Sequence, residues 1–87
     1  MMVEWSIHAK QRFFERSLMH GINYGDVEKN VLEQKVKQMQ KEGKIKTIFC
    51  IEDKFFTVIK AENRNSLGVI SIWESNEEEV NLWKKKK

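Results

Sequence analysis

The feature that most constrains the fold is the order in which two hydrophobic patterns follow one another along the chain. Up to about residue 34, apolar residues recur at helical spacing. From Ile45 to Trp73 the chain instead carries short runs rich in β-branched and aromatic residues, which are typical of strands. Helices followed by strands, without alternation, predict an α+β protein whose helices pack on one face of an antiparallel sheet.

A first helix is predicted after a short extended start at residues 2–5. Ser6 is a good N-cap residue, and Gly21 can end the helix beyond about Leu18. Helical periodicity marks a side of this helix that we expect to be buried, formed by Ala9, Phe13, Phe14 and Leu18.

A second helix is predicted at about residues 24–34. Asn23, with Asp26 three residues later, resembles a capping box at its start. Its expected inward side chains are those of Val27, Val31 and Leu32. Residues 35–40 fit either a continuation of this helix or the first strand of a hairpin turning at Glu42-Gly43. We favour the hairpin.

The following strands form an antiparallel meander of three to four strands in this prediction. Turn signals at residues 52–54 and 63–66 are short enough for antiparallel hairpins. If residues 35–40 are a strand, they add the fourth. The three clear strands are Ile45–Ile51, Phe55–Ala61 and Leu67–Trp73.

Strict alternation along the last strand predicts which of its residues share a face. It places Val69, Ser71 and Trp73 on one face, and Ile70 and Ile72 on the other. The face that mixes Ser71 with apolar residues is the candidate open face of the sheet.

The end of the chain predicts a short terminal helix. Ser75 with Glu78 is a capping-box pattern, which places this helix at residues 76–83. We expect residues 1–83 to form a single domain and residues 84–87 a disordered lysine tail.

Composition narrows the functional classes. A chain of 87 residues with one cysteine, Cys50, excludes two domains, an internal disulfide and a cysteine-cluster zinc site. No apolar run approaches the roughly 18 residues that a membrane-spanning helix needs, so we expect a cytoplasmic protein without membrane contact. Two histidines outside any metal motif, and the lack of a glycine-rich phosphate loop, predict neither a metal nor another cofactor.

Positive charge is unevenly distributed. The net charge is +3, but the four terminal lysines carry that sign and the rest of the chain is slightly acidic. A second group of lysines lies in the middle of the chain, where solvated surface and nucleic-acid binding are both open interpretations. Its candidate nucleic-acid contacts are Lys35, Lys37, Lys41 and Lys44.

Three residues of the first helix form a candidate site. His8, Arg12 and Arg16 recur every four residues and advance by only about 40° per step, so they line one side of the helix. Histidine exchanges protons near neutral pH, and arginine donates paired hydrogen bonds to phosphate oxygens. These are the groups that metal-independent cleavage of an RNA phosphodiester needs. The alternative is an ordinary solvated helix surface.

These residues carry a resemblance to a known family. Residues 6–16, Ser-Ile-His-Ala-Lys-Gln-Arg-Phe-Phe-Glu-Arg, followed by Gly21-Ile22-Asn23, resemble a small domain of unknown function that opens with His-Ala-x-x-Arg-x-x-x-Arg. That family is similar to RelE/ParE-like toxins. This chain departs from the pattern by inserting residues 17–20 and by carrying Ser71 and Trp73 where the family has threonine and tyrosine.

The resemblance implies two helices on an antiparallel sheet and toxin-type, metal-independent RNA cleavage. It implies His8 as acid or base, Arg12 and Arg16 as phosphate clamps, and Ser71 as a polar group across the cleft. Trp73 is expected to stack a base, with core packing as its alternative. RNA and a cognate antitoxin are the implied partners. RelE-like folds also include relatives without nuclease activity, so a non-catalytic nucleic-acid-binding or protein-interaction domain stays open.

Overall fold

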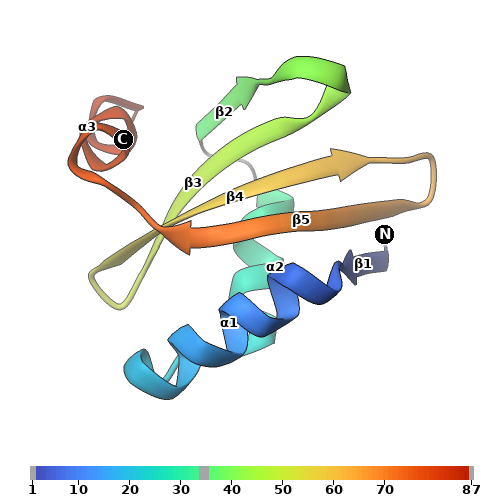
Figure 1. Ribbon diagram of the computed structural model, residues 1–87. Coiled ribbons are helices and arrows are strands. Elements are labelled where there is room, and N and C mark those ends of the chain that lie inside the picture. Colours follow the sequence, from blue (N-terminus) through green and yellow to red (C-terminus); the bar gives the residue numbers. More distant parts are fainter. Residues whose placement is uncertain (1, 34–35, 87) are drawn as a thin grey trace.

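The computed structural model describes residues 2–33 and 36–86 and shows an α+β protein built on a five-stranded mixed sheet (Figure 1). Helices cover both faces of this sheet, two on one side and one on the other. In chain order the elements are β1 (Met2–Trp5), α1 (Ile7–His20), α2 (Tyr24–Glu33), β2 (Val36–Met39), the 3-10 turn η1 (Lys41–Gly43), β3 (Ile45–Ile51), β4 (Lys54–Glu62), β5 (Ser66–Glu74) and α3 (Glu77–Lys86).

The sheet confirms the predicted meander and adds a strand to it. Strands β2 to β5 are antiparallel neighbours in sequence order, so residues 36–39 form the predicted hairpin rather than a longer helix. The extended start, β1, pairs in parallel with β5, from Met2 opposite Ser66 to Trp5 opposite Val69. The prediction of a purely antiparallel sheet of three to four strands is therefore wrong in strand number and in this pairing.

The main core lies between the sheet and the pair α1 and α2. Helix α1 packs on β5 and helix α2 on β3. Phe13 of α1, Val27 of α2 and Val58 of β4 are buried in one hydrophobic cluster. Trp5 closes this layer at the edge of the sheet, where its ring lies 5.3 Å from that of Phe13.

Two side chains predicted to be buried are instead largely exposed. Phe14 of α1 is 60% exposed and Leu32 of α2 is 41% exposed. A helix lying on a sheet buries only a narrow stripe, and each of these residues lies about 100° around its helix from a buried neighbour, Phe13 or Val31.

The caps of the first two helices match the predictions. The Ser6 hydroxyl accepts a hydrogen bond from the Ala9 amide at 3.0 Å, which confirms the N-cap of α1. Gly21 follows the last residue of α1 with a φ of 66°, a left-handed conformation that costs glycine little. The Asn23 side chain accepts from the Asp26 amide at 2.9 Å at the start of α2.

A β-bulge in β5 overturns the predicted alternation of faces. Ile59 of β4 pairs with Ser71, but Lys60 pairs with Val69, so Ile70 is an extra residue in β5. The extra residue keeps Val69 and Ile72 on the same face, buried against the helices α1 and α2. Ser71 and Trp73 consequently lie on the opposite face, with α3.

Helix α3 begins one residue later than predicted and ends later. Its reciprocal cap is formed by Asn76 and Glu79, with Glu79 N to Asn76 Oδ1 at 2.8 Å and Asn76 N to Glu79 Oε1 at 2.9 Å. The Ser75 hydroxyl is engaged instead with Thr57 Oγ1 at 2.7 Å. The helix continues through Lys84–Lys86, part of the predicted tail, because lysine favours helices and its charge suits the C-terminal end. Lys87 lies outside the described residues.

Candidate functional site

The first two residues of the predicted stripe lie together on the surface of α1. Ala9 and Phe13 turn toward the sheet, whereas His8 and Arg12 are exposed one helical turn apart. Neither makes a hydrogen bond or an ion pair with a residue that the structure describes. Arg16 continues the helix, but its side chain lies outside the described part of the chain. We call the surface formed by His8 and Arg12 the α1 flank.

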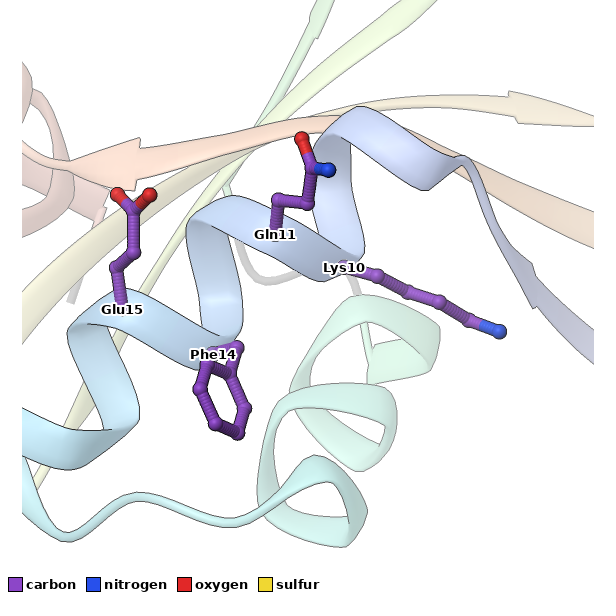
Figure 2. Close-up of a pocket in the computed structure, with 4 residues that line it drawn as sticks. All are labelled: Lys10, Gln11, Phe14 and Glu15. Carbon is purple, nitrogen blue, oxygen red and sulfur yellow. The ribbon is translucent and has the colours of Figure 1, made fainter.

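The α1 flank borders the hollow that lies on the outer surface of α1, because the lining residues Gln11 and Glu15 follow His8 and Arg12 by three positions each, about 60° around the helix. Lys10, Gln11, Phe14 and Glu15 line this hollow. Figure 2 shows Lys10 and Phe14 on the side of α1 that is next to α2, with Gln11 and Glu15 projecting from α1 away from α2. His8 precedes Lys10, and Arg12 precedes Phe14, by two positions, which is about 200° around the helix. The α1 flank therefore lies on the side of α1 that is turned away from α2.

Ser71 and Trp73 are not brought together with the α1 flank. Both project from the face of β5 that carries α3, so the sheet lies between them and α1. Ser71 is half-buried there. The expectation that Ser71 acts across a cleft from His8 and Arg12 does not match this geometry, and the bulge at Ile70 is the physical reason.

The predicted nucleic-acid lysines gather at another part of the molecule. Lys41 is exposed in η1, and Lys44 lies beside it with its Nζ 3.7 Å from Glu42 Oε2. Lys37 is exposed on β2, the edge strand farthest from β1 and β5. Lys35 lies outside the described residues. Because α1 packs on β5, these lysines and the α1 flank lie over different parts of the sheet.

A buried carboxylate on α3 is a feature that the sequence did not reveal. Glu79 is 3% exposed, and its Oε2 lies 2.8 Å from Lys46 Nζ. Its Oε1 accepts from Trp73 Nε1 at 3.1 Å and from the Asn76 amide at 2.9 Å. Burial by itself raises the pKa of Glu79, but the hydrogen bonds from Lys46, Asn76 and Trp73 together lower it below its ordinary value. We call these four residues the Glu79 clamp.

A buried lysine lies on the other side of the sheet. Lys60 of β4 is fully buried, and its Nζ donates to the Val31 carbonyl oxygen at 2.8 Å and lies 3.4 Å from Glu62 Oε1. Burial lowers the pKa of Lys60, and the charge of Glu62 opposes this effect only in part. A sequence signal was present, because Lys60 alternates with Phe56 and Val58 on the buried face of one strand.

The chemistry available at the α1 flank is that of one imidazole and one guanidinium in water. Such a pair can bind a phosphate diester through the guanidinium, and the imidazole can exchange a proton with a neighbouring hydroxyl group. Among the described residues, no group of three or more histidine, cysteine, aspartate or glutamate side chains is arranged to hold a metal ion. No helix in the described ranges is long and apolar enough to cross a membrane.

Comparisons with protein families, with curated proteins and with solved structures give no match for this chain. The resemblance to RelE/ParE-like toxins thus depends on the opening motif and on the likeness of residues 69–74 to the family's last strand. Of that motif, the structure describes the side chains of His8, Ala9 and Arg12, two on the surface and one in the core.

Proposed function

We propose that this domain binds single-stranded RNA through the α1 flank. The observation that carries the proposal is that His8 and Arg12 are exposed, lie one turn apart and have no partner among the described residues. An arginine without an internal acidic partner is available to donate two parallel hydrogen bonds to a phosphate. The family resemblance supports the same two residues.

Binding is favoured over cleavage because Ser71, the predicted catalytic residue from outside α1, does not lie at the α1 flank. Cleavage of an RNA phosphodiester requires a base for the 2′-hydroxyl and an acid for the leaving oxygen. Ser71, expected to assist from across a cleft, lies on the other face of the sheet. Phosphate binding needs only the cation and a hydrogen-bond donor, and His8 and Arg12 supply both.

Titration of a labelled oligouridylate with the purified protein tests the binding proposal. Arg12→Gln is expected to weaken binding about tenfold, since a hydrogen bond to a charged group contributes roughly 1.5 kcal/mol or more. The slope of log affinity against log salt concentration should fall by about 0.7, the value for one phosphate contact with a single strand.

Lys10→Gln is the matched control for Arg12→Gln. It removes one positive charge from the same helix, but on the side next to α2. We expect its effect on binding to be clearly smaller than that of Arg12→Gln. Equal losses in the two variants, or wild-type binding by Arg12→Gln, would contradict a specific role for the α1 flank.

Metal-independent RNA cleavage at the α1 flank is the second candidate function, favoured by the exposed imidazole beside a guanidinium. In this reaction His8 would accept the proton of the 2′-hydroxyl as that oxygen bonds to phosphorus. The bond from phosphorus to the 5′-oxygen breaks, and the imidazolium returns a proton to the leaving oxygen. Arg12 would hold a non-bridging oxygen. The products are a 2′,3′-cyclic phosphate and a 5′-hydroxyl end.

Incubation of the protein with RNA in the presence of a chelator separates the two candidates. A nuclease should release cyclic-phosphate ends, and His8→Ala should slow their release by about 100-fold or more. A chain of the same sequence with 2′-deoxy sugars should stay intact. RNA that is bound but remains uncut assigns the domain to binding alone.

A further inference from the structure

The described part of helix α3 contributes no residue to the main hydrophobic cluster, unlike α1 and α2, and packs on β2 and β3. The sheet face that carries α3 has a smaller apolar layer of its own, which includes the buried Val36 and Ile48. The apolar residues of α3, such as Val80 and Trp83, are only half-buried. The rings of Trp83 and Phe55 pack edge to face, with their centroids 5.2 Å apart. Figure 1 shows α3 over one end of the sheet, on the face away from α1.

The Glu79 clamp bonds α3 to two strands of the sheet. Lys46 projects from β3 and donates to Oε2 of Glu79, and Trp73 projects from β5 and donates to Oε1 of the same carboxylate. No second acidic side chain among the described residues pairs with Lys46. Glu79 is therefore the one acidic partner of Lys46 among the described residues.

The same donors suit a phosphate. A phosphodiester group, like a carboxylate, presents two oxygens that share one negative charge, and lysine and indole N–H groups donate to either. In the sheet, Lys46 of β3 and Ser71 of β5 are the two neighbours of Ile59 in β4. Trp73 is paired with Thr57, two residues before Ile59, so Lys46, Ser71 and Trp73 lie near one another on one face. The Trp73 ring adds a surface on which a base can stack.

We infer that Lys46 and Trp73 form a phosphate-binding site on the sheet, that Glu79 occupies this site from within the molecule, and that single-stranded RNA takes it when α3 moves aside. This inference rests on the proposed function for the nature of its ligand. It adds a second contact surface, on the face opposite to the α1 flank, and makes α3 a competitor of RNA.

The chain between β5 and α3 allows such a movement without disturbing the sheet. The Ser75 amide donates to the Phe55 carbonyl at 2.9 Å, and its hydroxyl is bonded to Thr57. Ser75 therefore stays with the sheet. Asn76, by contrast, is bonded to Glu79 of α3 through both its amide and its side chain. The pivot lies between residues 75 and 76.

Glu79→Gln in the full chain tests the inference with a labelled oligouridylate. The glutamine oxygen still accepts from Trp73 and Asn76, but it loses the charge that attracts Lys46. RNA affinity should rise about tenfold, and the salt slope should steepen by about 0.7 because one more phosphate is bound. Adding Lys46→Gln to this variant should abolish the gain. Glu78→Gln is the matched control, since it removes an exposed acidic charge from the same helical turn, and it should leave the salt slope unchanged.

Absence of a gain in Glu79→Gln, with the variant folded, overturns the inference whatever the wild-type protein does. The wild-type titration and Arg12→Gln decide the proposed function separately, so each can fail alone. Hydrogen exchange of the wild-type protein is the second measurement, in case the variant does not fold. Oligouridylate should accelerate exchange of the amides at 80–86, and unchanged or slower exchange there also overturns the inference.

Discussion

Lys60 shows how one residue can join two layers of this protein. Its ammonium group lies in the core and donates to the carbonyl of Val31. Val31 belongs to the last turn of α2, where helix carbonyls have no partner within the helix. The lysine therefore satisfies the end of α2 while Glu62 compensates part of its charge. Burial of a charge still costs free energy, and the lowered pKa of Lys60 expresses that cost.

Stability should consequently rise with pH in the alkaline range, and Lys60→Met should remove this rise. The pKa of Lys60 is lowered in the folded chain and returns to about 10.5 when the chain unfolds. Between these two values the unfolded state binds more protons, so the free energy of unfolding increases with pH. The gain is on the order of 1 kcal/mol for each unit of pKa shift.

Urea unfolding of wild type and Lys60→Met between pH 8 and pH 10 measures how the free energy of unfolding of each protein changes with pH. This range ends just below 10.5, the pKa of Lys60 in the unfolded chain. Lys41→Met, at an exposed position, is the control and should follow the wild-type curve. If wild type and Lys60→Met run parallel across this range, Lys60 is not the source of the pH dependence.

The residue-level contacts that the sequence predicted are the local ones. Ser6 and Asn23 bond to an amide three positions ahead, so spacing alone identified both caps. Lys60 and Glu79 find their partners in other elements of the fold. No local pattern can indicate such a partner, because it is set by how the layers pack. The exposure of His8 and Arg12 was predictable from helical periodicity.

At the scale of elements, one extra residue in β5 decides which groups can share a site. Alternation along the strand predicted Val69 and Ser71 on one face, and the bulge at Ile70 separates them. A bulge shifts the alternation of faces by one residue, but residues 69–73 include apolar residues at both odd and even positions, so their spacing did not reveal the shift. The bulge is also the point where α1 is attached, since the Ser6 hydroxyl donates to the Ile70 carbonyl at 2.9 Å.

Ser6→Ala should therefore destabilise the protein more than Asn23→Ala. The Ser6 hydroxyl makes two hydrogen bonds, one to the start of α1 and one to the bulge, so its loss should cost about 2 kcal/mol. Asn23 caps α2 through one bond at an exposed site, which predicts a loss of about 1 kcal/mol. Urea unfolding of both variants at neutral pH gives the comparison. Equal losses would mean that the bond to Ile70 adds nothing to the cap.

At the scale of the whole molecule, the sheet separates two helical layers. The layer of α1 and α2 contributes to the main hydrophobic cluster, and the described residues of α3 do not. The sequence predicted the antiparallel meander because its turns are local. It missed the parallel pairing of β1 with β5, which joins the start of the chain to residues 66–69. That pairing and α1 close the larger core. The described part of α3 contributes no residue to this core; it lies on the face that carries Val36 and Ile48 and is bonded to the sheet through the Glu79 clamp. The molecule should therefore lose α3 before it loses the core.

Acid is the condition that separates these two events. Glu79 has a lowered pKa in the folded protein, so it contributes stability above its ordinary value near 4.5, and this contribution is lost as pH falls through the lowered pKa. Two-dimensional NMR spectra recorded from pH 6 downward should show the resonances of α3 shifting or broadening before those of β4. In Glu79→Gln the α3 resonances should already differ at pH 6 and change little with acid, and exposed Glu78 supplies the control variant Glu78→Gln. Simultaneous loss of α3 and β4 in the wild-type protein would show that the clamp does not hold α3 independently of the core.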